Sequence, residues 1–533
     1  MRKKRRLKKH IKKRIKQVLV AVALSVAGYA AYQPFSSSAS AGVTDCRDTV
    51  VVPDDTIASS VLNGAIQSFV GSRAMSGASV GVCVMDIRNG YVVGGYNVDK
   101  KFIPASVTKL VTSASALKYL TENYRFRTRV KYTGELTEDG TIQGDLIVEG
   151  GLDPTLGSRY LDEDHEGFLP ALVETLRLWG VKRIAGGIRT EEQVKTLRQA
   201  YPSDWLDSDV TEYYGAGVYS LNYNDNLFSL IFDTSGGKVS IVDTIPHVVT
   251  FEIDNNMRAG TARNGRWLPA ASRAKYSEKF RLNGTIRLSE DPLELEMPAI
   301  YPSEGLKADI RETLEAEGIV VEGKKTDTAG ESSFQLLSYE SPVLPEVIKS
   351  LLHRSDNMYA ESVLRALGQH CKGQGMREAS IAAEAEVLGQ WNIDLSGESL
   401  YDGSGLARAN RMSPRFLTSV LRTAARDWQC GELFPTLLPV AGENGTVKKL
   451  LRETSLSGHI ALKSGSMRGV KCYSGYYPAE RPRYAVTLMV NRYRCNGEQL
   501  KKSIEQLFVD MFGDYQVDVV AKTLHAEQNK ENN

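Results

Sequence analysis

The 533-residue sequence has little of what metal centres, redox sites and nucleic-acid interfaces require. Its seven histidines form no H-E-x-x-H pair, and none of its six cysteines stands in a C-x-x-C spacing. We therefore expect no catalytic metal and no other cofactor. The net charge is only +2, and residues 1–16 hold most of the basic excess. The rest of the chain is acidic, which argues against a nucleic-acid partner.

The cysteines leave two alternatives open. An even number in an exported chain permits a set of disulfides whose pairing the sequence does not give, whereas buried free thiols account for the same count. The residues concerned are Cys46, Cys83, Cys371, Cys430, Cys472 and Cys495.

The N-terminus carries a basic run, an apolar stretch from Val18 to Tyr32, and a small-residue segment that ends at Ala41. This order is typical of a cleaved signal peptide over residues 1–41, which predicts export to the periplasm. An apolar stretch of about 15 residues is short for a membrane span, which needs ~20. A retained segment is the alternative, and it would hold the chain at a membrane surface.

Three short motifs occur in order along the chain: Ser106-Val107-Thr108-Lys109, Ser355-Asp356-Asn357 and Lys463-Ser464-Gly465. Each also has an ordinary structural interpretation as a first helical turn, a helix cap or a strand end. Their order, and their positions at breaks between predicted elements, favour a single shared site instead.

The first motif offers a nucleophile with its base, and the second offers a hydroxyl and an amide. A serine hydroxyl attacks only when a base accepts its proton, and residues three apart on a helix share a face, so Lys109 can reach Ser106. Burial and a second cation, Lys463, would lower the pKa of Lys109. Ser355 can pass a proton to the leaving amine, and Asn357 can bind the acyl-side amide of a substrate.

The third motif suits a substrate carboxylate. The Lys463 ammonium and the Ser464 hydroxyl can bind the carboxylate, and Gly465 lies on the same predicted strand edge. Backbone N–H groups of Ser106 and Ser466 would stabilise the oxyanion.

The elements around the motifs predict a sheet assembled from both ends of the chain. A hairpin spans Ser79 to Tyr96 around an Asn-Gly turn, and strands are expected at Ile460–Lys463, Cys472–Tyr477 and Tyr484–Val490. Helices are expected after Ser106 and on both sides of the second motif. Residues 126–330 contain short β-like runs between turn residues and are interpreted as a mostly β insertion.

On these motifs the chain resembles the class C low-molecular-mass penicillin-binding proteins, which are D-alanyl-D-alanine carboxypeptidases and endopeptidases of bacterial wall metabolism. Three further segments are similar to that family: Gly150–Leu156, Leu221–Asn226 and Asp402–Leu406. The resemblance implies a multi-domain α/β fold. Its catalytic domain would be of the penicillin-binding-protein and serine β-lactamase type, an antiparallel sheet with helices, interrupted by two mostly β inserted domains.

The division that the resemblance implies follows the chain in seven segments. They are a signal peptide (1–41), the first catalytic part (42–125), an inserted domain (126–150 and 220–330) with a second domain nested in it (151–219), the second catalytic part (331–520) and a disordered tail (521–533).

By resemblance, Ser106 is acylated by peptidoglycan stem peptides and by β-lactams, Lys109 is the base, and Ser355, Asn357 and Lys463 complete the catalytic set. Arg408 follows the Asp402–Leu406 segment, where family members hold a diaminopimelate side chain. Asp209 and Tyr214 are candidate helpers from the insertion, although Asp209 also suits a solvated loop. The family usually has threonine where this chain has Ser464, which keeps the hydroxyl and loses a methyl group.

Two other functions remain as alternatives. One is a β-lactamase or esterase on the same fold, against which the long insertion argues. The other is a wall-binding scaffold without catalysis, against which the intact motifs argue. The sequence leaves open the oligomeric state, the balance of carboxypeptidase and endopeptidase activity, and the residue at the third stem position.

Overall fold

The structure is a computed structural model that describes residues 57–161, 167–246, 251–260, 268–325 and 332–513. The expected signal peptide, Cys46 and the expected tail lie outside these residues. Among the described helices, none combines the length and the apolar character needed to cross a bilayer.

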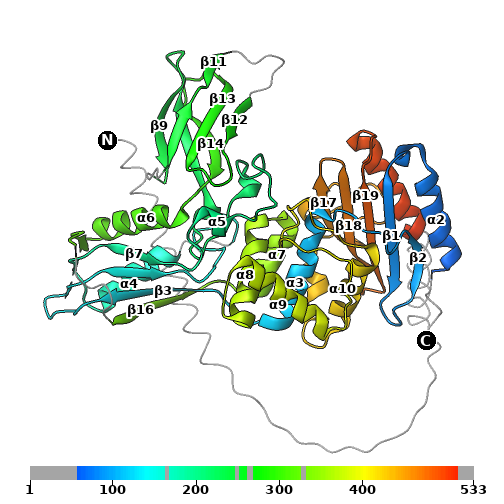
Figure 1. Ribbon diagram of the computed structural model, residues 1–533, viewed down its shortest axis with the longest axis horizontal. Helices are drawn as coiled ribbons and strands as arrows, with labels where there is room; N and C mark the ends of the chain where they lie inside the picture. The colour runs from blue at the N-terminus through cyan, green and yellow to red at the C-terminus, as the bar shows by residue number, and fades with distance from the viewer. Residues whose placement is uncertain (1–56, 162–166, 247–250, 261–267, 326–331, 514–533) are drawn as a thin grey trace, which may run out of the picture. The chain divides into compact units, whose positions relative to one another are not determined.

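A five-stranded antiparallel sheet joins the two ends of the described chain (Figure 1). Its strand order is β17-β18-β19-β1-β2, and Val84 of β1 lies opposite Val486 of β19. The sheet predicted from the first hairpin and the last strands is thereby confirmed, with β17 at an edge. The strands are β1 (Ser79–Asp86), β2 (Val92–Tyr96), β17 (Ala461–Met467), β18 (Val470–Tyr477) and β19 (Tyr484–Asn491).

The hairpin turn forms where the Asn-Gly pair predicts it. Gly90 has a left-handed backbone with φ of 80°, a conformation that costs glycine little. Its N–H donates to the Asp86 carbonyl at 2.8 Å, and the Asn89 side chain accepts from the Tyr91 N–H at 2.8 Å.

Helices cover both faces of the sheet, because successive strand residues point to opposite sides. In β19, Val486 packs into one hydrophobic core and Ala485 into the other. Figure 1 shows α2 (Ser59–Gly71) and the red helix of residues 497–513 on the first face. The core on the second face contains residues of α3 (Lys109–Leu120), α7 (Leu344–Arg354), α8 (Asn357–Lys372), α9 (Arg377–Gln390) and α10 (Pro414–Arg426), and α10 lies directly against β1 and β19.

Between α3 and α7 the chain builds two further cores. The first inserted core lies between the sheet β16-β3-β5-β7, the small sheet β15-β6-β4 and helices α4 and α6. Its elements are β3 (Arg127–Thr133), β4 (Thr141–Ile142), β5 (Leu146–Glu149), α4 (Phe168–Leu178), β6 (Arg183–Ile184), β7 (Ile188–Glu191), α6 (Pro302–Ala316), β15 (Val320–Val321) and β16 (Ser333–Glu340).

The second inserted core lies between the sheet β14-β8-β9 and the sheet of β10, β11, β12 and β13. The short helix α5 (Leu197–Ala200) contributes to it. The strands are β8 (Leu227–Asp233), β9 (Ser240–Ile245), β10 (Glu252–Asn255), β11 (Arg258–Gly260), β12 (Leu268–Ser272), β13 (Lys279–Arg287) and β14 (Leu293–Pro298).

These cores divide the insertion at residues other than those expected. β7 falls in the segment 151–219, yet it pairs in parallel with β5, so that segment is not a separate domain. The separate core is built instead from residues 197–219 together with the strands β8 to β14. β16 pairs with β3, so the insertion also continues past residue 330. Parallel and long-range pairing has no local sequence signal, which explains the difference.

The cysteines of the described residues are free thiols, and Cys83, Cys430 and Cys472 are buried. For these residues the alternative of free thiols therefore holds over the alternative of disulfides.

Candidate active site

Ser106 lies on the 3₁₀ turn Ala105–Thr108 that leads into α3, and its side chain is half-buried. Ala105 before it has a left-handed backbone with φ of 50°, which is strained for a residue with a Cβ. Strain of this kind persists only where surrounding contacts fix the backbone. One such contact is β17, since a Cβ on Gly465 would lie 2.8 Å from the Pro104 carbonyl.

Lys109 points back along the helix to Ser106. Its Nζ donates to Ser106 Oγ at 3.1 Å, to Asn357 Oδ1 at 2.6 Å and to the Ser404 carbonyl at 2.6 Å. The side chain is fully buried, so these acceptors replace water around the amine. Two of its N–H directions are therefore taken by an amide and a carbonyl, and the third faces the Ser106 hydroxyl.

The second motif occupies the break between α7 and α8. Ser355 ends α7 with a left-handed backbone of φ 62°, and Asp356 caps α8 by accepting from the Tyr359 N–H at 3.1 Å. Arg354 and Asp356 form an ion pair at 2.7 Å, which restrains the turn between the two helices. The second motif is thus a sharp helix-to-helix turn that presents Ser355 and Asn357 to the site.

The third motif faces the second across the site. Lys463 is buried on β17, and its Nζ donates to Ser355 Oγ at 2.8 Å and to the Ser464 carbonyl at 2.7 Å. The Ser464 hydroxyl shares a hydrogen bond of 2.7 Å with Thr446. Ser466, farther along the strand, is exposed, and its hydroxyl accepts from Lys471 at 2.7 Å.

Both buried amines have pKa values below the ordinary lysine range. Burial lowers the pKa of Lys109 to about 8, while the nearby carboxylates of Asp402 and Glu361 oppose that shift. Burial also lowers the pKa of Lys463, and the neighbouring Lys109 ammonium adds to the effect. Two ammonium groups in one dry site repel each other, so one of them readily gives up its proton.

The candidates from the insertion lie beside the second motif. Asn357 Nδ2 donates to the Tyr214 carbonyl at 2.7 Å, and the Tyr214 hydroxyl donates to Asp209 Oδ1 at 3.3 Å. The side chain of Arg408 is half-buried and makes no hydrogen bond or ion pair with the described residues. The structure thus brings Asp209 and Tyr214 together and leaves the Arg408 guanidinium without a protein partner there.

A model of the D-Ala-D-Ala carboxypeptidase 3 (S13) family matches residues 62–511. The chain belongs to this family. Its fold and its class, a serine peptidase, are those expected from the motifs.

Relatives in the S13 family match most of the chain. The D-alanyl-D-alanine carboxypeptidase of Actinomadura sp. (strain R39) is 26% identical over 446 residues, which are 80% of each chain. The carboxypeptidase DacB of Haemophilus influenzae is 24% identical over 424 residues, 78% of this chain and 86% of that one.

Solved structures show the same fold. The crystal structure of penicillin binding protein 4 (dacB) from Haemophilus influenzae gives a TM-score of 0.69 at 23% identity and covers 86% of this chain and 100% of that one. A structure of the same protein complexed with a β-lactam gives a TM-score of 0.64 at 21% identity, covering 86% and 99%.

Several hydrogen bonds of this S13 site could not be predicted from the sequence. Thr446 had no signal, because a lone threonine in a loop has no distinguishing neighbours. Ser404 lies in the Asp402–Leu406 segment that was singled out, but only the fold shows that its carbonyl reaches Lys109. The same holds for the Tyr214 carbonyl, a backbone group that no side-chain pattern reveals.

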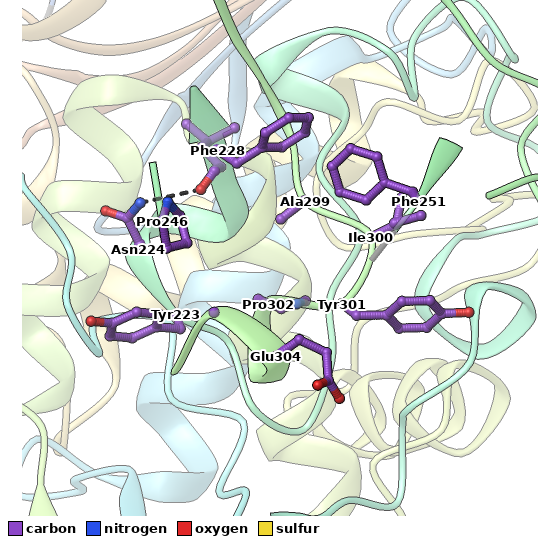
Figure 2. Close-up of a pocket in the computed structure, with 12 residues that line it drawn as sticks. Tyr223, Asn224, Phe228, Pro246, Phe251, Ala299, Ile300, Tyr301, Pro302 and Glu304 are labelled. Carbon is purple, nitrogen blue, oxygen red and sulfur yellow. Dashed lines mark hydrogen bonds between the residues drawn. The ribbon is translucent and has the colours of Figure 1, made fainter. Parts of the chain in front are cut away.

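A pocket far from the motifs in sequence lies where residues of the second inserted core meet Tyr223 and the start of α6 (Figure 2). Its lining includes Tyr223, Phe228, Phe251 and Tyr301 and none of the motif residues. A cavity of about 20 Å³ has room for one water molecule. The pocket contributes no residue to the site formed by the three motifs.

The close approach of β17 to the Ser106 turn makes Gly465 sensitive to substitution. In Gly465→Ala the new Cβ would lie 2.8 Å from the Pro104 carbonyl and 3.1 Å from the Ser106 nitrogen, both backbone atoms that cannot rotate away. We expect acylation by a fluorescent penicillin to slow at least tenfold, about the effect of disturbing one oxyanion donor. Gly497→Ala, where the Cβ meets open space, is the control. Unchanged labelling of a folded Gly465→Ala protein would contradict this geometry.

Proposed function

We propose that this S13 peptidase cleaves D-Ala-D-Ala ends and cross-links of peptidoglycan stem peptides through an acyl-enzyme on Ser106. The observation that carries the proposal is the Lys109 amine, which is buried, bonded to two acceptors and 3.1 Å from the Ser106 hydroxyl. Asn357 Oδ1 and the Ser404 carbonyl take two N–H bonds. When the third proton is absent, the lone pair therefore points at Ser106.

In the acylation step, neutral Lys109 accepts the Ser106 proton while Ser106 Oγ forms a bond to the carbonyl carbon. The N–H groups of Ser106 and Ser466 are the proposed donors to the oxyanion. The C–N bond then breaks, and the leaving amine takes the proton from Lys109 by relay through Ser355, which leaves Lys109 neutral. Water then attacks the ester carbonyl while Lys109 takes its proton. Lys109 passes that proton to Ser106 Oγ as the acyl–oxygen bond breaks, which frees Ser106.

Substrate binding would set the charge states of the two lysines. A terminal carboxylate beside Lys463 and Ser464 stabilises the Lys463 ammonium. That positive charge in turn disfavours a second one on Lys109, because like charges lower each other's pKa. The substrate thereby helps to prepare the base. Thr446, which holds the Ser464 hydroxyl, supports the same carboxylate contact.

Arg408, Asp209 and Tyr214 are proposed to bind the side chain at the third stem position. An arginine side chain that pairs with none of the described residues suits a carboxylate of the substrate, as diaminopimelate offers. Export to the periplasm through the 1–41 segment is likewise a proposal, in keeping with a wall substrate.

Because a β-lactam resembles the D-Ala-D-Ala end, it should acylate the same serine, as the bound complex of the related fold suggests.

A single substitution tests the nucleophile. Ser106→Ala should lose D-Ala release from a stem pentapeptide and covalent labelling by fluorescent penicillin, with at least ~10³-fold lower activity. Thermal unfolding of both proteins controls for misfolding. Equal labelling of the variant and the wild type would refute the assignment. Rapid nitrocefin turnover without D-Ala release would favour a β-lactamase, and the absence of both activities would favour a scaffold.

The pH profile of acylation tests the base. Only neutral Lys109 accepts a proton, so with a pKa of about 8 its neutral fraction falls as pH decreases. Below that pKa we expect the acylation rate to drop about tenfold for each pH unit, and above it to level off. Stopped-flow labelling over a range in which the melting temperature is constant measures this. A flat profile below the pKa would rule out a lysine base.

Arg408→Ala tests the third-position contact. Loss of an arginine–carboxylate bond should cost about 1.5–3 kcal/mol, or roughly 10- to 150-fold in kcat/KM, on peptides with diaminopimelate. The control substrate carries lysine there, which lacks the carboxylate, and its cleavage should change much less. An equal loss on both peptides would show that Arg408 acts on the fold and not on the substrate.

A further inference from the structure

The loop of residues 402–407 carries a direct contact to the amine of Lys109. Its Ser404 carbonyl accepts from Lys109 Nζ at 2.6 Å, while the Ser404 N–H donates to Glu361 Oε1 on α8 at 2.8 Å. The loop also presses on the turn before the nucleophile, since a Cβ on Gly405 would lie 2.1 Å from the Ala105 carbonyl. A shift of this loop would therefore move an acceptor of the base.

Asp402 organises this loop from within. It is fully buried, and its carboxylate accepts five hydrogen bonds of the described residues. The donors are Trp205 Nε1 (2.9 Å), Ser404 Oγ (3.3 Å), the Gly405 N–H (2.8 Å), the Ala407 N–H (2.6 Å) and Asn410 Nδ2 (2.7 Å). A buried carboxylate with this many donors fixes the backbone around it, because leaving any donor unpaired would be costly.

Trp205 comes from the insertion, 197 residues before Asp402. It is 2% exposed and packs edge-to-face against Tyr201 in the second inserted core, which also includes Ala407 of the loop. The indole can only donate, and its single N–H donates to Asp402. The insertion thus holds the loop in place by one buried hydrogen bond and by apolar packing against Ala407.

We propose that Trp205, Asp402 and Glu361 are positioning residues for Lys109: they hold the 402–407 loop so that the Ser404 carbonyl directs the amine toward Ser106. This inference rests on the proposed role of Lys109 as the base. It gives the inserted segment a part in catalysis, because the segment supplies the indole that holds the loop. If these residues had only a structural role, substituting them would lower the stability of the protein and would change the acylation rate by the same factor at every pH.

The direction of the effect follows from charge and solvation. Burial lowers the pKa of Lys109 to about 8, and the Asp402 carboxylate opposes that shift. Removing the indole donor leaves the carboxylate less compensated, and a looser loop lets water solvate the buried amine. Both changes favour the charged amine, so the pKa of Lys109 rises and the neutral fraction at pH 7 falls. At higher pH the amine is neutral again and the defect shrinks.

Trp205→Phe in the full chain is the test, with Trp391→Phe as the matched control. Trp391 also donates its indole N–H to a carboxylate, Asp427, at 3.0 Å, but it lies at the C-terminal end of α9 and has no bond to the 402–407 loop among the described residues. We expect Trp205→Phe to slow penicillin acylation at pH 7 about tenfold relative to the control, one pKa unit in the base, with the gap closing as pH rises. Equal rates in the two variants, or a gap that is the same at all pH values, would overturn the proposal.

Glu361→Gln gives an independent answer if Trp205→Phe does not fold. The amide oxygen can still accept from the Ser404 N–H, but the negative charge that raises the pKa of Lys109 is gone. Burial raises the pKa of Glu361 itself to about 7, so the wild type carries this charge above that pH. Between pH 7 and 8 acylation should therefore be faster in the variant, and an unchanged or slower rate there would overturn the proposal. Failure of the proposed function is distinct, because wild type would then escape labelling or Ser106→Ala would be labelled equally.

Discussion

The amine of Lys109 is buried, no carboxylate of the described residues is bonded to it, and the rest of the site depends on this. An amine in water would be protonated and useless as a base at neutral pH. Here two neutral acceptors, Asn357 and the Ser404 carbonyl, direct two of its N–H bonds. Burial lowers its pKa to about 8, so a usable fraction is neutral. The third direction, toward Ser106, is then free for proton transfer.

The fold meets this constraint by bringing distant segments together around one amine. The helix that starts after Ser106 supplies the lysine, the break between α7 and α8 supplies Asn357, and β17 supplies the second cation, Lys463. The insertion also contributes, through the Tyr214 carbonyl on Asn357 and through Trp205. Two strained backbones lie in this small region, and the contacts around them fix what local preference would not.

Much of the catalytic sheet could be predicted, because its signals are local. The Asn-Gly pair specifies the first hairpin, short apolar runs indicate β18 and β19, and Ser355 falls at a visible break between two helical patterns. The convergence of the three motifs followed from their order. The insertion was predicted less well, since the parallel pairing of β5 with β7 and the return of β16 to β3 depend on contacts across long stretches of chain. The contact between Trp205 and Asp402 was beyond prediction for the same reason.

The low pKa of the buried Lys109 amine can be measured directly, without substrate turnover. NMR titration of the protein labelled with ¹³C at lysine Cε follows each amine, and a Lys109→Met variant assigns its signal. We expect a resonance that titrates near pH 8 in the wild type and is absent from the variant. If the assigned Lys109 signal titrates in the ordinary lysine range, about 10.4, the amine is charged at neutral pH, which contradicts its role as the base.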